Sequence, residues 1–305
     1  MDNARRAALV SYLLLTLVAL FWSGNVVLGR GVIDHVPPLA LNFWRWAAAL
    51  AIMLPFSWRA FVEHRAAIRR DWKMLSLLGL LGITCFNSFA YIAFQTTTAI
   101  NAALINTLMP IMIIAMVIVG FRETMGPRRA LGLAVSFVGT LVILMRGDPA
   151  VLSTLAFTKG DLWMLAGAVS YALYSVLLRL KPPELDGVEL LAVVTAFGLV
   201  IMLPVYIVET VLVAPMPVNA TSVGMVAYVA LFPSVLAYVF WNRGIAVVGA
   251  GRASLFVHLM PVFTSALAIG FLGESLQAFH VVGMILVFGG LVLTTRPDRV
   301  QTGAT

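Results

Sequence analysis

Residues 102–123 read AALINTLMPIMIIAMVIVGFRE, and residues 253–274 read ASLFVHLMPVFTSALAIGFLGE. Both stretches are long apolar runs that contain Leu-Met-Pro and end in glutamate, and they lie 151 residues apart. The tetrapeptide of residues 52–55, Ile-Met-Leu-Pro, recurs at 201–204 with an offset of 149. Several matches at nearly the same offset indicate an internal repeat, because chance matches between apolar segments would scatter over many offsets.

The composition assigns this repeat to a lipid bilayer. Of the 305 residues, 61% are hydrophobic and 11% charged, whereas an average soluble domain is about half apolar and a quarter charged. A membrane span needs roughly 20 apolar residues, and ten such runs are present. The predicted spans are 8–28, 39–57, 73–94, 100–120, 127–145, 161–180, 187–210, 222–243, 252–272 and 277–295. Five spans fall in residues 1–148 and five in residues 149–305, which are the two predicted repeats.

The distribution of Lys and Arg predicts the orientation of the spans. Of the 20 basic residues, 16 fall in the connections on the side of both termini, 3 fall on the opposite side, and Arg45 lies inside a span. Cytoplasmic connections are enriched in Lys and Arg, so both termini are predicted to be cytoplasmic. The net charge of +7 therefore reflects membrane topology rather than a nucleic-acid partner. The first apolar run continues to about residue 28 without a cleavage site, which favours a span over a signal peptide.

Because five is an odd number, the second half enters the membrane from the opposite side. The predicted fold class is an all-α membrane protein of ten transmembrane helices, arranged as two inverted five-helix repeats around a central cavity. Inverted repeats are typical of secondary transporters, since two near-equivalent halves can exchange conformations and open one site to each side in turn.

Several short motifs resemble those of a known family. They are Trp22-Ser23-Gly24-Asn25, Arg45, Pro110, Pro261, Leu272-Gly273-Glu274 and Gly283. In their order and duplication they resemble the EamA branch of the drug/metabolite transporter superfamily. The resemblance implies a basket of ten helices in which spans 1, 3, 4, 6, 8 and 9 line the cavity and spans 5 and 10 support it. One departure is Phe121-Arg122-Glu123, which lacks the family's usual Gly before Glu. The aromatic residues are similar to those of aromatic amino-acid exporters of the YddG type.

One pair of polar residues recurs in both halves in swapped order. Asn87 and Tyr91 are four residues apart on one helix face, and the offset of 151 carries them onto Tyr238 and Asn242. Embedded polar groups are costly in lipid and so need a role. These four residues are predicted to line the cavity and bind the solute, with helix–helix hydrogen bonding as the alternative.

A second set adds aromatic rings. Trp22 and Asn25 in span 1 map onto Tyr171 and Tyr174 in span 6 at an offset of 149. Rings and amides together suit a planar, amphipathic solute, because the rings pack its apolar body and the amides orient its polar end. The alternative for Trp22 is a place in an interfacial aromatic belt.

Two prolines are candidate hinges. Pro110 and Pro261 lack an N–H, so the carbonyls of Asn106 and Val257 lose their usual helical partner. A kink at matching positions in both halves favours a moving gate, and the alternative is a static bend. Seven glycines are predicted to let helices approach closely: Gly79, Gly82, Gly132, Gly139, Gly283, Gly289 and Gly290.

Two further residues have open roles. His258, which maps onto Thr107, is either a neutral packing residue, a solute contact or a proton-coupling group. Arg45 either extends outward to the membrane surface or attracts a carboxylate solute toward the mouth of the cavity. All 13 carboxylates lie outside the spans or at their ends, which disfavours a buried carboxylate relay for protons.

The predicted function is export of amino acids, aromatic or other neutral ones, or of related metabolites across the bacterial inner membrane by alternating access. The alternative is a multidrug or other metabolite carrier of the same fold. Enzyme motifs such as HExxH, GxSxG or a phosphate loop are not found, and the single Cys85 excludes an internal disulfide. The expected partners are a small solute and the lipid bilayer, with no cofactor or metal, and the chain is expected to act as a monomer.

Overall fold

The computed structural model describes residues 3–29, 36–272 and 275–295. Their helices are α1 (Asn3–Gly29), α2 (Pro38–Glu63), α3 (Arg65–Arg70), α4 (Trp72–Leu78), η2 (Gly79–Cys85), α5 (Phe86–Ala93), α6 (Ala99–Thr107), α7 (Met109–Phe121), α8 (Pro127–Leu144), η3 (Pro149–Thr154), α9 (Lys159–Leu177), η4 (Leu178–Leu180), α10 (Gly187–Leu212), α11 (Ala220–Ala230), η5 (Leu231–Leu236), α12 (Ala237–Val248), α13 (Ala250–Ser254), η6 (Leu255–His258), α14 (Leu259–Leu272) and α15 (Ala278–Thr295). Within the described ranges, ten helical segments are long and apolar enough to span a membrane, as predicted. Gly273 and Glu274 of the family motif lie outside these ranges.

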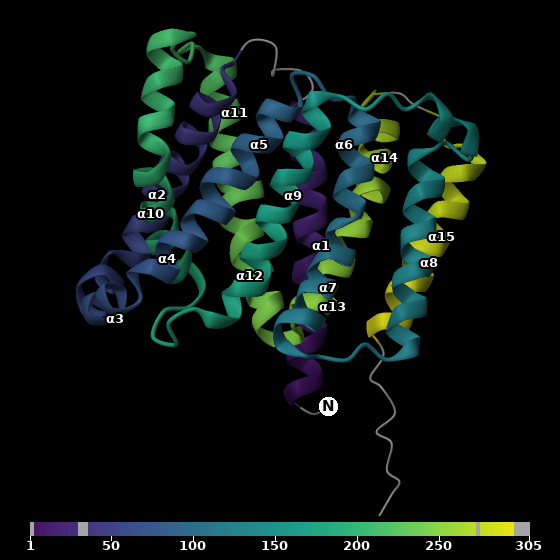
Figure 1. Cartoon of the computed structure of the whole chain (residues 1–305), viewed down its shortest axis with the longest axis horizontal. Helices are drawn as coiled ribbons and strands as arrows, with labels where there is room; N and C mark the ends of the chain where they lie inside the picture. Colours follow the sequence, from purple (N-terminus) through teal and green to yellow (C-terminus); the bar gives the residue numbers. More distant parts are fainter. Residues whose placement is uncertain (1–2, 30–35, 273–274, 296–305) are drawn as a thin grey trace, which may run out of the picture.

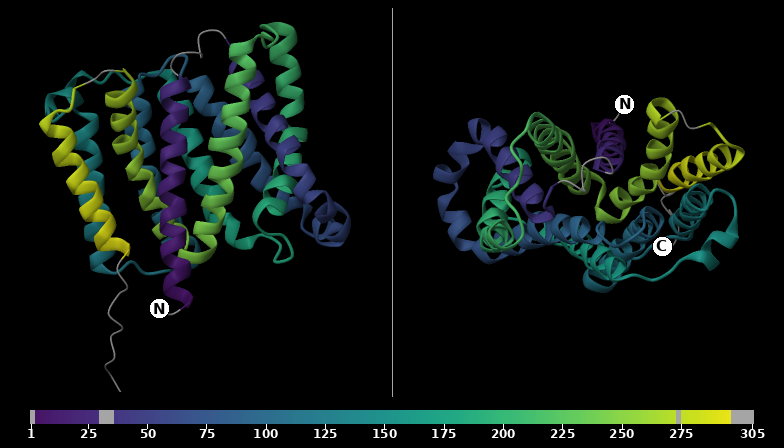
Figure 2. Two further views of the ribbon diagram at one scale, coloured as in Figure 1. Left: turned by 180° about the vertical axis from the view of Figure 1, so that it is seen from behind. Right: turned by 90° about the horizontal axis from the view of Figure 1, so that it is seen from above.

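The long helices run side by side between two faces of the molecule (Figures 1 and 2). Helix α1 begins, and α15 ends, on the same face, which is called the N-terminal face below. The pair α8 and α15 stands at one edge of the molecule, and α2 and α10 stand at the other. The ten-helix membrane fold is confirmed, with spans 5 and 10 in the outer position that the family resemblance implies.

Helices α8 and α15 meet through glycines that the internal repeat relates. A Cβ added to Gly132 would lie 2.7 Å from the Gly290 carbonyl oxygen, and one added to Gly139 would lie 2.8 Å from that of Gly283. The repeat maps Gly132 onto Gly283 and Gly139 onto Gly290, so each contact is the image of the other. Reciprocal contacts of this kind are the signature of a two-fold axis. Gly289 was also predicted to pack, but this is wrong, because nothing lies within 4 Å of its added Cβ.

Spans 3 and 8 each contain a π-helical turn at equivalent places. The turns are η2 and η5, and the offset of 151 carries residues 80–85 onto 231–236. A π-helical turn shifts the backbone hydrogen bonds by one residue and is frequent at functional sites. Both halves therefore interrupt the same helix at the same level.

Spans 4 and 9 change their winding just before their prolines. In span 4, α6 ends at Thr107 and α7 begins at Met109, next to Pro110. In span 9 the tighter 3-10 turn η6 precedes α14, which contains Pro261 near its start. The two prolines thus lie at matching interruptions of their helices.

Arg122 occupies the position before Glu123 where the family usually has glycine, and its backbone conformation is one that favours glycine. It ends α7 with φ 54° and ψ 29°, in the left-handed region that glycine adopts without penalty. A side chain there costs about 1–2 kcal/mol. Arg122 therefore occupies a position whose backbone geometry suits glycine.

Candidate functional site

A buried arginine forms hydrogen bonds with residues of both halves of the molecule. Arg45 of α2 is only 2% exposed, and its Nη1 donates to Asn87 Oδ1 at 2.8 Å and to Tyr91 Oη at 3.0 Å. Its Nε donates to Ser234 Oγ, and its Nη2 donates to the Pro233 carbonyl at 3.1 Å. The guanidinium is thus directed inward, rather than outward to the membrane surface. Among the described residues no carboxylate forms an ion pair with it.

The proline of span 8 explains one of these partners. Pro233 has no N–H, which leaves the Val229 carbonyl without its usual helical donor. The Ser234 hydroxyl donates to that carbonyl at 2.6 Å and so repairs the helix locally. The same hydroxyl oxygen accepts from Arg45, so the interrupted backbone of span 8 is tied to span 2.

The two π-helical turns supply a pair of symmetry-related acceptors. The carbonyl oxygen of Gly82 accepts from Tyr238 Oη at 2.8 Å, and that of Pro233 accepts from Trp22 Nε1 at 3.2 Å and from Arg45. The offset of 151 maps Gly82 onto Pro233. Each half therefore offers one backbone carbonyl to side chains that arrive from the other half.

An aromatic cluster fills the space beside these carbonyls. Trp22 contacts Tyr171 and Trp241 with ring centroids 5.5 and 5.3 Å apart, and Trp46 contacts Tyr238 at 4.9 Å. The cluster consists of Trp22, Trp46, Tyr171, Tyr174, Tyr238 and Trp241, all buried. Trp22 is therefore a core residue here, rather than part of an interfacial belt.

The cluster has polar edges, some of them without a partner. Tyr174 Oη donates to Asn242 Oδ1 at 3.0 Å, and Trp241 Nε1 donates to Ser175 Oγ at 3.1 Å. The Tyr171 hydroxyl, Asn242 Nδ2 and Trp46 Nε1 are buried without a hydrogen-bond partner. Such orphaned groups are rare in folded proteins, and a binding role is one explanation for them.

Two predicted residues lie apart from this cluster. Asn25 is partly exposed, three residues beyond Trp22, and takes no part in the ring contacts or hydrogen bonds just described. His258 is fully buried, with Nδ1 2.8 Å from Ser136 Oγ and Nε2 3.2 Å from the Thr107 carbonyl oxygen. Its two nitrogens thus bond to span 5 and to the interruption in span 4. A solute contact for either residue stays a prediction.

The face opposite the N-terminal face is fastened by a buried carboxylate. Asp161, at the start of α9, is 1% exposed. It accepts from the Thr97 hydroxyl, from Asn101 Nδ2 at 2.9 Å and from the Thr158 backbone N–H at 2.7 Å. Thr97 belongs to the connection between spans 3 and 4, and Asn101 lies in the first turn of α6. One side chain therefore holds the tip of that hairpin against span 6.

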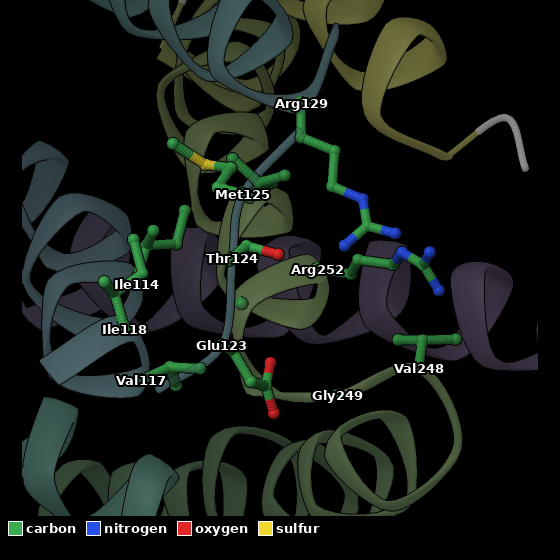
Figure 3. Close-up of a pocket in the computed structure, with 12 residues that line it drawn as sticks. Ile114, Val117, Ile118, Glu123, Thr124, Met125, Arg129, Val248, Gly249 and Arg252 are labelled. Atoms are coloured by element: carbon green, nitrogen blue, oxygen red, sulfur yellow. The ribbon is translucent and has the colours of Figure 1, made fainter. Parts of the chain in front are cut away.

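The N-terminal face contains a pocket of about 270 Å³ (Figure 3). It lies between α7, the segment leading into α8, the end of α12 and the start of span 9. Residues that line it include Ile114, Val117, Glu123, Arg129, Arg252 and Leu255. None of the sequence predictions pointed to this pocket.

Comparison with known proteins agrees with this architecture. A family model described as the EamA-like transporter family matches residues 9–145 and again residues 158–296. The chain belongs to the EamA-like transporter family. The match covers both halves, in agreement with the resemblance found in the sequence motifs.

Several relatives of this EamA-like transporter align over most of their length. The uncharacterised transporter YyaM of Bacillus subtilis is 29% identical over 296 residues, covering 95% of this chain and 94% of the relative. An uncharacterised transporter of Archaeoglobus fulgidus is 28% identical and covers 93% of this chain and 97% of its own. A probable terminal-alkyne amino-acid exporter of Streptantibioticus cattleyicolor is 25% identical over 74% of each chain. These names are those of transporters, not of enzymes.

A solved crystal structure has the same fold. It superposes with a TM-score of 0.71 and 21% sequence identity, covering 94% of this chain and 96% of the other. At this identity the likeness concerns the fold alone.

Proposed function

We propose that this EamA-like transporter exports amino acids, aromatic or other neutral ones, or related metabolites. It does so from the cytoplasm across the bacterial inner membrane by alternating access, as a monomer with both termini cytoplasmic. The two repeats, residues 1–148 and 149–305, are the moving halves. The observation that carries the proposal is the central cluster of aromatic rings, orphaned polar atoms and one buried cation.

The chemistry of the cluster suits an amino acid. The rings of Trp22, Tyr171 and Trp241 pack against one another in this structure, and in the proposed cycle they separate to offer apolar faces to a side chain. The Tyr171 hydroxyl and Asn242 Nδ2 have unused hydrogen-bonding capacity for polar groups of the solute. Asn87, Tyr91 and Asn25 are proposed to complete the polar lining, and His258 to contact the solute from span 9.

The buried charge favours an anionic group over a cationic one. Arg45 is bonded to neutral acceptors only among the described residues, so its positive charge is not neutralised there. A solute carboxylate can replace Asn87 and Tyr91 as its partner, whereas a cationic drug would be repelled. This argument favours amino acids over the multidrug alternative.

The arrangement of the two faces suits a state open toward the cytoplasm. The Asp161 contacts close the face opposite the N-terminal face, and the pocket lies on the N-terminal face. In the proposed cycle, breaking the Asp161 contacts opens the outer side while the pocket closes. The interrupted helices at Pro110 and Pro261 are the proposed hinges, since their backbone is already unwound there.

One relative supports the choice of solute. The Streptantibioticus cattleyicolor protein bears the name of a probable amino-acid exporter, and it aligns over 74% of this chain. The name supports amino acids as a class.

The test is counterflow in proteoliposomes loaded with unlabelled amino acid. We expect saturable uptake of at least one of labelled tryptophan, phenylalanine, threonine and methionine. If all four fail to exchange, the amino-acid assignment is wrong. Flux that does not saturate with solute concentration would point to a channel instead.

A further inference from the structure

The pocket on the N-terminal face shares no residue with the central cluster, so it is a separate feature of the molecule. Its volume of about 270 Å³ is just below the range for small-molecule sites, roughly 300–1,000 Å³. One wall is apolar and is formed by Ile114, Val117 and Ile118 of α7 together with Leu255 of η6. This wall can pack the side chain of a small amphipathic solute.

Charged groups of both signs line the same pocket. Arg129 comes from α8 and Arg252 from α13, and Figure 3 shows their guanidinium groups directed to the same side of the pocket. Glu123 lies in another part of the pocket, beyond Thr124 in this view. Its Oε1 lies 2.6 Å from Arg179 Nη1 in a partly exposed ion pair.

The internal repeat does not duplicate these two arginines. The offset of 151 maps Arg252 onto Asn101 and Arg129 onto His280. Asn101 takes part in the contacts with Asp161 on the opposite face. The two arginines are therefore particular to the N-terminal face, whereas the helices that carry them are duplicated.

We propose that this pocket is a loading site that binds a zwitterionic amino acid with an apolar side chain before it reaches the central cluster. Arg129 and Arg252 take the carboxylate, Glu123 takes the ammonium group, and the wall formed by α7 packs the side chain. The identity of the solute rests on the proposed function, but the location of the site does not.

The test uses a cysteine placed in the pocket. Thr124 is exposed, and Thr124→Cys in a Cys85→Ser background gives a single reactive thiol. The rate of its modification by a methanethiosulfonate reagent is measured with L-phenylalanine, 3-phenylpropionate, phenethylamine or inorganic phosphate present. We expect L-phenylalanine to protect the thiol best, 3-phenylpropionate less, and phenethylamine and phosphate not at all. Equal protection by inorganic phosphate would overturn the proposal in favour of a simple anion site.

Two arginine variants, one inside and one outside the pocket, test whether the protection of the thiol depends on the charge in the pocket. Arg252→Gln should raise the L-phenylalanine concentration needed for protection roughly tenfold, as loss of a charge-assisted hydrogen bond predicts. Arg243→Gln removes an exposed arginine that does not line the pocket, and should leave protection unchanged. Protection of Arg252→Gln at the same L-phenylalanine concentration as in the parent would contradict the proposed role of this arginine.

Counterflow on the same preparations separates this proposal from the proposed function. Protection without any amino-acid exchange would retain the pocket and reject amino-acid transport. Exchange without protection would reject the pocket and retain transport. If Thr124→Cys fails to fold, Arg252→Gln in the otherwise unchanged chain is compared with Arg243→Gln, and only the former should raise KM while leaving kcat nearly unchanged.

Discussion

Arg45 places a buried positive charge on a membrane-spanning helix. A charged side chain at the centre of such a helix costs roughly 2.5–3.5 kcal/mol on insertion scales. Four acceptors offset this cost, and they come from spans 3 and 8. Their geometry matches the planar fork of a guanidinium, which can donate in several directions at once. The arginine therefore connects elements of both repeats through a single side chain.

Replacing Arg45 with Lys should not be a conservative change. An ammonium group keeps the charge but cannot reach Ser234, Asn87 and the Pro233 carbonyl together. We expect the free energy of unfolding to fall by about 2 kcal/mol or more, because hydrogen bonds to a charged group are lost. Thermal unfolding of purified Arg45→Lys should occur at a lower temperature than in the wild type. The exposed Arg59→Lys is the control, and equal unfolding temperatures for both variants would contradict the role given to Arg45.

Arg122 offers the opposite experiment, a change that should stabilise. Its φ of 54° suits glycine, so Arg122→Gly should raise stability by about 1 kcal/mol through relief of strain. The measurement is again the thermal unfolding temperature. A lower unfolding temperature would mean that contacts of the Arg122 side chain stabilise the protein by more than its backbone strain destabilises it.

Sequence reasoning at the scale of residues found most of the cluster but not how it is connected. Offsets of 149 and 151 selected Trp22, Tyr171, Tyr174 and Tyr238, because the repeat doubles their signal. Trp46 and Trp241 have no such doubled signal, and a tryptophan near a span end resembles an interfacial residue. The roles of the Gly82 and Pro233 carbonyls were missed, because backbone acceptors leave no trace in residue type.

At the scale of elements, neighbouring glycines on α15 provide a matched pair. A Cβ at Gly290 would lie 2.5 Å from the Gly132 carbonyl oxygen and the Ser136 backbone nitrogen, whereas Gly289 has open space. Gly290→Ala should therefore separate α8 from α15 and lower both folded yield and unfolding temperature. Gly289→Ala should be neutral or stabilising by up to about 1 kcal/mol, because alanine favours the helix.

Similar losses of yield in both glycine variants would argue against close packing at this crossing. The sequence predicted close packing for both glycines, since composition alone does not show which face of a helix meets its neighbour. The π-helical turns were likewise beyond prediction, because an i→i+5 pattern depends on contacts from other helices rather than on local propensity.

At the scale of the whole molecule, the spans, their number and the repeat followed from the sequence, because lipid requires long apolar helices and the duplication preserved their order. The side that we propose to be closed could not be predicted from the sequence, since that proposal depends on a few contacts such as those of Asp161. The state of a transporter is a small difference between two packings of the same helices.

Asp161→Asn should shift that balance toward an outward-open state. The amide lacks the charge that Thr97, Asn101 and the Thr158 N–H stabilise, and these bonds weaken accordingly. The measurement is the labelling rate, from outside, of Ala102→Cys in a Cys85→Ser background. Ala102 is 3% exposed, so labelling should be slow in the parent and faster with Asp161→Asn. Asp148→Asn, which changes an exposed carboxylate, should have no effect, and an unchanged rate with Asp161→Asn would exclude the proposed gate.

The central claim is that solute binds where the two repeats meet, and Tyr238→Phe tests it most directly. This change keeps the ring in the aromatic cluster but removes the hydroxyl that donates to Gly82 and accepts from Asn87. Tyr206→Phe, at a tyrosine stacked on Phe43 away from the cluster, is the control. We expect Tyr238→Phe to lower the counterflow rate per folded molecule roughly tenfold, with unchanged folded yield, a factor typical of the loss of one buried hydrogen bond. Normal counterflow per folded molecule together with reduced yield would contradict the account, because Tyr238 would then serve only to hold the helices together.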